Sequence, residues 1–430
     1  MVVGLYQLIL WLALPLVWLR LQWRARSEPA YGARVGERFG RVPAQVPSNC
    51  IWFHTVSAGE TIAAAPLIRQ LAEEFAPSPF LVTTMTPTGS QQVTARLSDC
   101  VAHCYAPYDF GFAVSRFFDQ VQPRLLVLME TELWPNLIAT AHRRGIPVLL
   151  VNARLSERSA KGYARVPGLT RPMLARLSGI ACQSEAHAER FAAIGADPAT
   201  IQVLGSVKYD VTEPAGFAEN VAALRRVFAI TEQPVWIAAS THPGEDAIVL
   251  EAFRLVREKH PDCCLLLVPR HPVRADDVCA LAANAGFSVS RHSARIASSE
   301  DARATDVIVG DLMGTLLTLY GLADVAFVGG SFVEVGGHNP LEPALCQVPV
   351  VSGPYQFNFT DVMADLEQRG GLRTVADAAQ LAEVVTAWLG DTSSRQHAGA
   401  SAAAALADNR GAMERVCELL RGWIRTVLLH

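Results

Sequence analysis

Residues 51–61 read IWFHTVSAGET, and this stretch predicts a strand that turns directly into a helix. Ile51–His54 is an apolar run of strand length, bounded by a turn-forming segment. Ser57 and Gly59 suit the turn, since glycine adopts backbone conformations that other residues avoid. The helix is expected to start near Glu60. An apolar strand that leads into a helix is typical of a parallel sheet covered on both faces.

The same alternation of apolar runs and helix-like segments continues along the chain in two series. Each series predicts a parallel sheet flanked by helices, so we expect an α/β fold with two Rossmann-like domains. The expected strands of the first series are Ile51–His54, Phe80–Thr83, Val101–Tyr105, Leu125–Met129, Val148–Asn152, Gly179–Cys182 and Ile201–Leu204. Those of the second series are Val235–Ala239, Cys264–Val268, Phe287–Ser290, Asp306–Val309, Val325–Val328 and Val348–Val351.

The expected domain junction is the short segment Val211–Gly216, which contains Pro214. The predicted division is a membrane-anchor helix (1–24), an N-terminal domain (25–212), a C-terminal domain (213–410) and a last helix (411–430). The last helix has the length to pack back on the N-terminal domain. Ligands of such sheets bind at the carboxyl ends of the strands, so a cleft between two facing domains is the expected site.

The composition indicates a folded chain that touches a membrane. Half of the 430 residues are hydrophobic and 18% are charged, which is typical of a chain that buries a core. The mean hydropathy of +0.22 is high for a purely soluble protein. The net charge of −4 gives no overall cationic field, so nucleic acid is not expected as a partner. The nine cysteines lack disulfide-like spacing and are expected to be free thiols in a reducing compartment.

The N-terminal segment is the expected membrane contact. Val2–Leu19 is almost entirely apolar and has about the length needed to cross a hydrocarbon core. Three arginines follow within residues 20–26 and none precedes, which places the rest of the chain in the cytoplasm. The tryptophans in the segment suit a membrane interface, so a helix that lies in the interface is the alternative. They are Trp11, Trp18 and Trp23.

The turn after the first strand carries a candidate general base. Glu60 is expected at the carboxyl end of the sheet, where a carboxylate can accept a proton from an incoming hydroxyl. A glutamate in the first turn of a helix can also merely complement the helix dipole. From position alone, both interpretations stay open. His54, at the end of the strand, is a second candidate base, although a hydrogen-bonded core histidine is the commoner role.

A second pair of carboxylates follows the fourth strand in the sequence LMETELWPN. Glu130 and Glu132 would point the same way if the strand continued. Two close carboxylates push their pKa values apart, which suits acid–base chemistry. The alternative is a helix N-terminus, with Pro135 at an early helical position. Trp134 is expected to be a packing residue.

Basic residues follow two later strands. After Val148–Asn152 come four of them, which suit phosphate or carboxylate recognition unless they line a solvated helix face. They are Arg154, Arg158, Lys161 and Arg165. Lys208 follows Ile201–Leu204, where it can neutralise charge that develops on a phosphate leaving group. An ordinary surface lysine is the alternative there.

The loops of the second series together predict a nucleotide site. Ser240 and Thr241 precede a glycine in a turn suited to phosphate, and Arg270 follows the next strand. The glycines of VGGSFVEVGGHNPLEP allow close approach of the backbone to a ligand, and Asn339 and Glu342 can hydrogen-bond a ribose or base. The sequence has no GxxxxGK[ST] or HExxH motif and no spaced His/Cys set, so no metal is expected.

These motifs, taken in order, resemble one family. They are HTVSAGE, ETELWPN, NARLSERSAKGY, GSVKYD, STHPGED, PRHP, GGSFVEVGGHNPLEP and GPYQFNF. They resemble the 3-deoxy-D-manno-octulosonic acid (Kdo) transferases of Gram-negative lipopolysaccharide synthesis from the anchor to about residue 361. The resemblance implies a GT-B fold with two domains facing a central cleft, a CMP-Kdo donor, and a tetra-acylated lipid A precursor as acceptor. It also implies inversion at the anomeric carbon, the cytoplasmic face of the inner membrane, and no required metal.

The resemblance also implies roles for particular residues. It makes Glu60 the general base, and Glu130 and Lys208 residues that stabilise the transition state. The implied CMP contacts are Pro269, Arg270, Met313, Gly314, Thr315, Asn339, Pro340, Leu341 and Glu342. One departure is GDLMGTL, where the family commonly has GDTMGEL, so Leu312 and Thr315 replace a hydroxyl and a carboxylate. At these two positions the resemblance implies only backbone contacts.

Two other functions fit the same architecture. A nucleotide-sugar epimerase would bind a similar donor but would need no membrane anchor. A membrane-tethered nucleotide-binding protein without activity would bind CMP but would not depend on the carboxylates that follow the first and fourth strands.

Overall fold

A computed structural model of the chain describes residues 2–297 and 305–429. The chain divides into two compact units. Unit 1 comprises Met1–Asp210 and Arg410–His430, and unit 2 comprises Val211–Asn409. The sequence placed the corresponding boundaries at 212/213 and 410/411.

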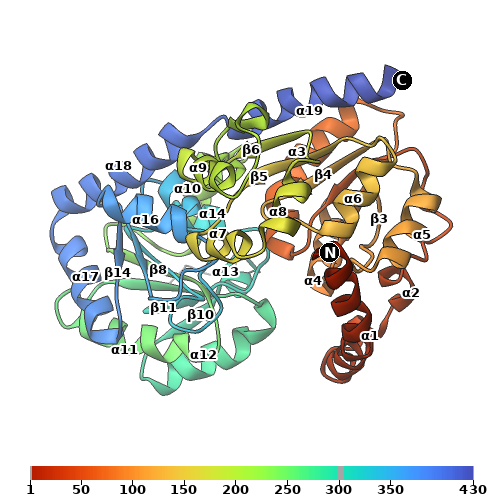
Figure 1. Ribbon diagram of the computed structural model, residues 1–430. Helices are drawn as coiled ribbons and strands as arrows, with labels where there is room; N and C mark the ends of the chain where they lie inside the picture. Colours follow the sequence, from red (N-terminus) through yellow and green to blue (C-terminus); the bar gives the residue numbers. More distant parts are fainter. Residues whose placement is uncertain (1, 298–304, 430) are drawn as a thin grey trace. The chain divides into compact units, whose positions relative to one another are not determined.

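Unit 1 is built on a parallel sheet of seven strands in the order β3-β2-β1-β4-β5-β6-β7 (Figure 1). The strands are β1 Ile51–His54, β2 Phe80–Thr84, β3 Ala102–Tyr105, β4 Leu125–Met129, β5 Val148–Ala153, β6 Gly179–Cys182 and β7 Ile201–Val203. Each agrees with the expected strand to within one residue at either end. The strand order reverses between β1 and β4, which pair directly with Ile51 opposite Leu125.

Both faces of this sheet are covered, as the continuous apolar strands predicted. Trp52 and Leu126 belong to one buried cluster, whereas Phe53 and Val127 belong to the cluster on the other face. Side chains alternate along a strand, so a strand with two covered faces needs apolar residues at every position. The main helices are α1 Val2–Ser27, α2 Val35–Arg38, α3 Ala58–Glu74, α4 Pro87–Leu97, α5 Gly111–Val121, α6 Pro135–Arg143, α7 Glu157–Ala164, α8 Pro167–Leu174, α9 Glu185–Ala193 and α19 Ala412–Leu429.

The last helix, α19, completes the core of unit 1. Val416, Leu420 and Ile424 recur at helical spacing, are fully buried, and belong to the same cluster as residues of α3. Asp210 fixes the start of the helix, because its carboxylate accepts hydrogen bonds from the Gly411 and Met413 N–H groups at 2.6 and 2.7 Å. The chain therefore returns to unit 1 after it has formed unit 2.

Unit 2 is a second parallel sheet of seven strands, in the order β10-β11-β9-β8-β12-β13-β14. The strands are β8 Val235–Thr241, β9 Cys264–Pro269, β10 Val289–Arg291, β11 Val307–Val309, β12 Val325–Val328, β13 Val350–Ser352 and β14 Leu372–Thr374. The helices are α10 Phe217–Val227, α11 Glu245–Arg257, α12 Ala275–Asn284, α13 His292–Ala297, α14 Leu316–Tyr320, α15 Leu341–Leu345, α16 Thr360–Gln368, α17 Ala378–Gly390 and α18 Thr392–Asn409.

Four strands of unit 2 differ from the expectation, and the first is β8, which ends at Thr241, two residues after Ala239. The strand expected at Phe287 begins two residues later, at Val289, and the Phe287 ring packs on Phe253 with ring centroids 5.0 Å apart. The strand expected at Val348 begins at Val350, after Pro349, which has no N–H to donate to the ladder. Strand β14 was not expected, because two of its three residues are exposed and carry no apolar pattern.

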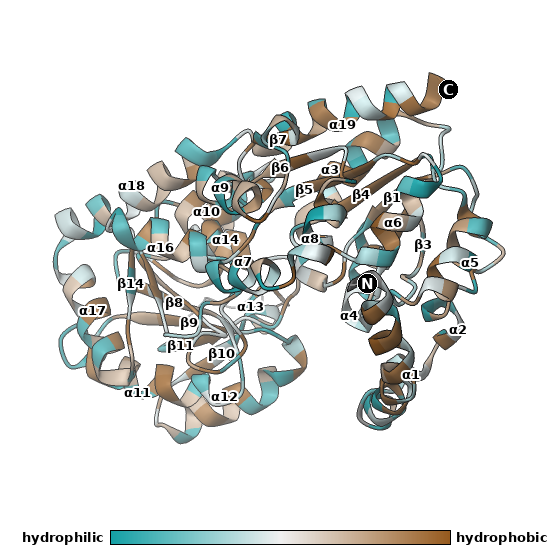
Figure 2. Cartoon of the chain, in the orientation of Figure 1, coloured by the Kyte–Doolittle hydropathy of each residue, from teal (hydrophilic) through white to brown (hydrophobic). Residues whose placement is uncertain are grey.

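Helix α1 is apolar on its outer side and packs lengthwise on unit 1 (Figure 2). It has 26 residues and so a length of about 39 Å. Gly4–Arg26 is long and apolar enough to cross a membrane by length and composition, and 6% of its most apolar window is buried. Tyr6 donates a hydrogen bond to Asp109 at 2.8 Å, and the Trp18 ring packs at a tilt against Phe39, with ring centroids 6.1 Å apart. These lateral contacts hold α1 against unit 1.

We expect Leu420→Ala to lower the free energy of unfolding by about 2–5 kcal/mol, because Leu420 is fully buried between α19 and the sheet of unit 1. Urea-induced unfolding measured by tryptophan fluorescence checks this. The matched control is Leu429→Ala on the same helix, where the side chain is 84% exposed. The control should change stability by less than about 0.5 kcal/mol. Equal unfolding midpoints for the two variants would contradict the packing of α19.

Candidate active site

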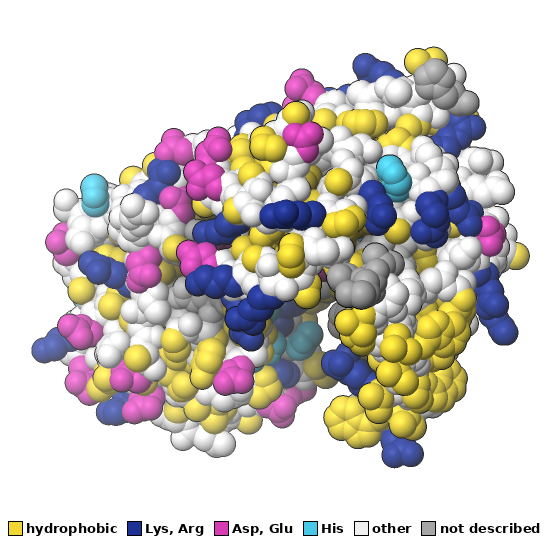
Figure 3. All heavy atoms as spheres, in the orientation of Figure 1, with side chains coloured by type: hydrophobic (Ala, Val, Ile, Leu, Met, Phe, Trp, Pro, Cys, Tyr) yellow, Lys and Arg dark blue, Asp and Glu magenta, His cyan; other side chains and the backbone are white. Residues whose placement is uncertain are grey.

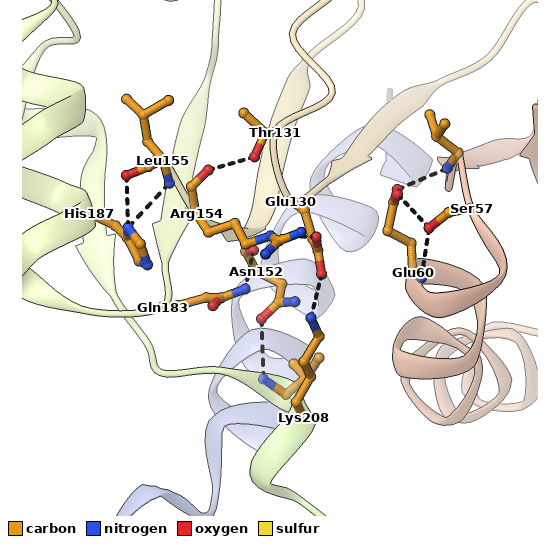
Figure 4. A network of polar contacts seen from close by, with 12 residues as sticks. Ser57, Glu60, Glu130, Thr131, Asn152, Arg154, Leu155, Gln183, His187 and Lys208 are labelled. Atoms are coloured by element: carbon orange, nitrogen blue, oxygen red, sulfur yellow. Dashed lines mark hydrogen bonds and ion pairs between the residues drawn. The ribbon is translucent and has the colours of Figure 1, made fainter. Parts of the chain in front are cut away.

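Glu60 is fixed in the turn between β1 and α3 (Figure 4). The helix begins at Ala58, two residues before Glu60, because the Ser57 hydroxyl caps it by accepting the Glu60 N–H at 3.3 Å. The same hydroxyl donates to Glu60 Oε1 at 2.8 Å, and the Val56 N–H donates to Glu60 Oε2, also at 2.8 Å. This arrangement is close to a capping box. Each carboxylate oxygen keeps acceptor capacity for one more hydrogen bond.

The surroundings of Glu60 raise its pKa to about 8. The largest cause is burial, since the residue is 7% exposed, and the second is the negative charge of Glu132. The hydrogen bond from the Val56 N–H opposes both effects. A carboxylate with a pKa near neutrality is a stronger base than an ordinary glutamate, and such groups concentrate in active sites.

Glu130 forms the centre of an ion-pair network after β4 (Figure 4). Its Oε2 accepts from Arg154 Nε at 2.6 Å, and its Oε1 lies 3.0 Å from Lys208 Nζ. Glu130 is 5% exposed, so the two cations compensate a charge that would otherwise be costly to bury. Thus Arg154, which the sequence assigned to a basic patch, is directed to Glu130 instead. Arg158, Lys161 and Arg165 are exposed on or next to α7.

Glu132 does not point in the same direction as Glu130, as it would if strand β4 continued through both residues. Strand β4 ends at Met129, and Glu130 adopts a left-handed conformation with φ of 52°. Glu132 then accepts a hydrogen bond from Trp134 Nε1 at 2.8 Å, and burial raises the pKa of its carboxyl group. The Trp134 ring packs edge-on against His54, as expected for a packing residue.

His54 is a core residue and not a second base. It is fully buried, its Nδ1 lies 3.0 Å from the Thr83 hydroxyl, and burial lowers its pKa to about 3. A neutral imidazole of such low basicity, enclosed in the core, is a poor acceptor for a substrate proton.

Asn152 positions Lys208, a role that sequence reasoning missed. Lys208 lies on the short 3₁₀ helix Val207–Tyr209, and Asn152 Oδ1 accepts the Val207 N–H at 3.2 Å. Asn152 is fully buried with φ of 50°, a conformation that asparagine tolerates better than most residues. The sequence signal that could have indicated this role is a polar asparagine at the end of an otherwise apolar strand.

Glu60 and Glu130 flank the point where the strand order of unit 1 reverses. Glu60 follows β1 and Glu130 follows β4, and these two strands are paired in the sheet. Such a switch point, outside the carboxyl ends of the strands, is where open α/β sheets bind ligands. The structure therefore brings the predicted site residues Glu60, Glu130 and Lys208 to one edge of the sheet of unit 1.

Unit 2 has an equivalent switch point between β8 and β12, and Glu245 holds its two loops together. The fully buried Glu245 carboxylate accepts four backbone hydrogen bonds at 2.7–2.9 Å. The donors are the N–H groups of His242, Gly330, Ser331 and Phe332. Gly329 permits the close approach, because a Cβ there would lie 2.8 Å from the Ser240 carbonyl oxygen. Sequence reasoning did not single out Glu245.

A histidine pair lies beside Arg270 on the same edge. The Arg270 N–H donates to the Thr241 carbonyl at 3.0 Å. The Nε2 atoms of His242 and His338 are 2.9 Å apart, so one donates to the other. The pKa of His338 is lowered to about 3, first by burial and then by the charge of Arg270. The loops thus present one guanidinium and neutral imidazoles, which suit the recognition of an anion.

Of the remaining residues predicted to contact CMP, some lie in loops of unit 2 and three are buried. Met313 is 73% exposed, Gly314 has φ of 79°, and Thr315 donates its hydroxyl to the Leu312 carbonyl at 3.1 Å. Asn339 donates to Glu342 Oε1 at 3.4 Å. Three other predicted residues are buried, so their side chains pack inside unit 2: Pro269, Pro340 and Leu341. Within residues 2–297 and 305–429, no cluster of three metal-ligating side chains occurs.

Comparison with known proteins identifies the family of the chain. Residues 33–211 match the family described as 3-Deoxy-D-manno-octulosonic-acid transferase (kdotransferase), and residues 232–405 match Glycosyl transferases group 1. The 3-deoxy-D-manno-octulosonic acid transferase of Haemophilus influenzae is 39% identical over 97% of this chain and 98% of that protein. That of Bordetella pertussis is 36% identical over 98% of this chain and 99% of that protein.

The solved structures show the fold. A UDP-GlcNAc 2-epimerase from Neisseria meningitidis has a TM-score of 0.57 at 13% identity, with 86% of this chain and 99% of that chain covered. The two α/β units and the family matches define an enzyme, a glycosyltransferase with the GT-B fold. More narrowly, the chain belongs to the 3-deoxy-D-manno-octulosonic acid transferase family.

We expect Glu245→Gln to destabilise unit 2 by about 3 kcal/mol, because the amide nitrogen would face backbone N–H donors that now bind a carboxylate oxygen. Hydrogen exchange of the Gly330–Phe332 amides should accelerate in the variant. The matched control is Glu251→Gln, on an exposed position of the same helix α11. Unchanged exchange at these three amides would show that Glu245 does not hold the loop.

Proposed function

We propose that the enzyme transfers Kdo from CMP-Kdo to a hydroxyl group of a tetra-acylated lipid A precursor, with inversion at the anomeric carbon. Kdo transfer follows from the family to which the chain belongs. The donor, the acceptor and the stereochemistry are the proposal. One observation carries it: Glu60, a buried carboxylate with a pKa of about 8, flanks the same switch point as the Glu130–Lys208 ion pair.

The reaction is a single displacement. Glu60 accepts the proton of the acceptor hydroxyl as its oxygen attacks the anomeric carbon of Kdo from the face opposite CMP. The new C–O bond forms while the bond to the phosphate oxygen breaks, and CMP leaves with the electron pair. Inversion results because only one displacement occurs. Positive charge builds up on the sugar in the transition state, as in other glycosyl transfers.

Protein groups stabilise the charges that develop. We assign Glu130 and Lys208 to the transition state, and Arg270 with the loop N–H groups of unit 2 to the phosphate of CMP. Pro269 and the segments Met313–Thr315 and Asn339–Glu342 are assigned to the nucleotide, through backbone groups where their side chains are buried. The family resemblance implies that this reaction needs no bound metal ion.

Helix α1 associates the enzyme with the membrane that contains its acceptor. Its apolar surface and the family of the chain are consistent with membrane association. We assign the catalytic units to the cytoplasmic face of the inner membrane, since the arginines follow the apolar segment and none precedes it. The similarity to an epimerase concerns the fold alone, and the family matches support a transferase over both alternatives.

We expect Glu60→Gln to lower the transfer rate by about 10²–10⁴-fold, because an amide cannot accept the hydroxyl proton. The assay supplies freshly generated CMP-Kdo and a tetra-acylated lipid A precursor to the purified protein in detergent, and mass spectrometry measures the lipid.

The control for this experiment is Glu73→Gln, an exposed position on the same helix α3, which should keep full activity. CMP binding should persist in both variants. If wild-type protein leaves the lipid unchanged with active donor, the proposed function is wrong. If Glu60→Gln is fully active, transfer stands but Glu60 is not the base.

The dependence of kcat/KM on pH should follow the ionisation of the Glu60 carboxyl group. The base must be deprotonated, so activity should rise with pH up to about 8, the pKa of its carboxyl group. The charge of Glu132 raises that pKa, so Glu132→Gln should move the rising limb to lower pH. Glu73→Gln is again the control. A limb that stays in place in Glu132→Gln would argue against titration of Glu60.

A further inference from the structure

A cavity of about 320 Å³ lies between α1 and the body of unit 1. Leu10, Val17 and Leu21 of α1 form one wall, and Met85 and Phe110 contribute to the opposite wall. This volume is near the lower end of the range for ligand sites, about 300–1,000 Å³. The apolar walls suit a hydrocarbon chain.

Arg38, at the inner wall of the cavity, has hydrogen-bond capacity that the protein does not use. The residue is 1% exposed, and its Nη1 donates to the Met85 carbonyl at 2.8 Å. Its buried Nε and Nη2 make no well-formed hydrogen bond to the described residues, and the Tyr108 hydroxyl lies close to the guanidinium. The guanidinium packs over the Tyr105 ring at 4.1 Å, which compensates part of its charge but none of its N–H donors. Buried donors without partners are costly, so the site favours an anionic ligand.

The cavity carries more positive than negative charge. Arg20 and Arg24 of α1 line it together with Arg38. Asp109 is the acidic residue of the lining, and its carboxylate is already engaged by the Tyr6 hydroxyl and by the Asn136 and Leu137 N–H groups at 2.8–2.9 Å. Three guanidinium groups next to an apolar wall match a phosphate ester attached to an acyl-bearing lipid.

The outer side of α1, away from this cavity, carries an exposed apolar surface. The side chains that face away from unit 1 are large, apolar and exposed, and they form the hydrophobic surface seen over α1 in Figure 3. They include Leu5, Leu8, Leu12, Leu16, Leu19 and Trp23. An exposed apolar surface of this size is expected to contact a membrane. A lipid then reaches the cavity without leaving the membrane.

The cavity wall is also connected to the turn that holds Glu60. The Met85 N–H donates to the Val56 carbonyl at 3.0 Å, and the Val56 N–H donates to Glu60 Oε2. Met85 therefore lines the cavity and is joined through one residue to the proposed base. A lipid anchored here by a phosphate is next to the segment that must receive its hydroxyl group.

We propose that the cavity under α1 binds the phosphate and part of an acyl chain of the lipid acceptor, with Arg38, Arg20 and Arg24 on the phosphate. This proposal rests on the proposed function, because it takes the acceptor to be a phosphorylated glycolipid. It assigns the recognition of the acceptor's phosphate to these three arginines rather than to the exposed basic residues of α7.

The test measures equilibrium binding of the lipid A precursor, in detergent micelles and without donor, so that it does not depend on turnover. The variants are Arg20→Gln/Arg24→Gln and, separately, Arg38→Gln. The control Arg26→Gln/Arg41→Gln removes the same charge as the double variant but at exposed positions outside the cavity. We expect Kd to rise about tenfold or more in both cavity variants and to stay unchanged in the control.

A precursor that lacks its phosphate groups separates charge recognition from folding. Wild-type protein should bind this precursor weakly, and the cavity variants should bind it with the same low affinity as wild type.

Arg20 and Arg24 are exposed on α1, so the Arg20→Gln/Arg24→Gln variant still tests the proposal if Arg38→Gln is unstable. Equal Kd values for wild type and the cavity variants would overturn the proposal, although transfer would stand. If the variants bound the precursor as wild type does but bound anionic phospholipid vesicles less well, the cavity would bind ordinary bilayer lipids, and the proposal would be wrong. Loss of precursor binding in the variants, with no transfer by wild type, would support the cavity and reject the proposed reaction.

Discussion

Parallel pairing places the carboxyl ends of neighbouring strands at the same edge of each sheet, and the remaining features of this enzyme follow from that constraint. In unit 1 the chain order reverses between β1 and β4, so the turns that follow these strands are neighbours although 70 residues separate Glu60 from Glu130. In unit 2 the same reversal brings the loops after β8 and β12 together. Residues distant in sequence therefore become neighbours through backbone geometry alone.

Each switch point buries a carboxylate, and the protein compensates these charges in different ways. Glu130 is compensated by two cations, whereas Glu245 accepts four backbone N–H groups. Glu60 receives only a hydroxyl and one N–H, and burial raises its pKa to about 8. The fully compensated carboxylates hold structure in place. Of these three carboxylates, Glu60 has neither a cation nor four N–H donors beside it, and its raised pKa makes it the one able to exchange a proton.

The sequence predicted much of the fold, since strands covered on both faces must be apolar at every position. It also indicated the carboxyl-end residues Glu60, Glu130 and Lys208. It could not reveal Asn152 or Glu245, because their roles depend on backbone N–H groups from distant segments that carry no side-chain signal. Strand β14 was missed for a related reason, since Arg373 and Thr374 are exposed and show no apolar pattern. Arg154 resembled a member of a surface patch, because its ion pair with Glu130 joins residues 24 positions apart in the sequence.

The return of the chain to unit 1 imposes an order on biosynthesis. Unit 2 is continuous in sequence, so it can fold while the ribosome is still translating. Unit 1 lacks α19 until the last residues emerge, and until then the face of its sheet that α19 covers stays exposed to water. The core of unit 1 therefore closes only after unit 2 has been made.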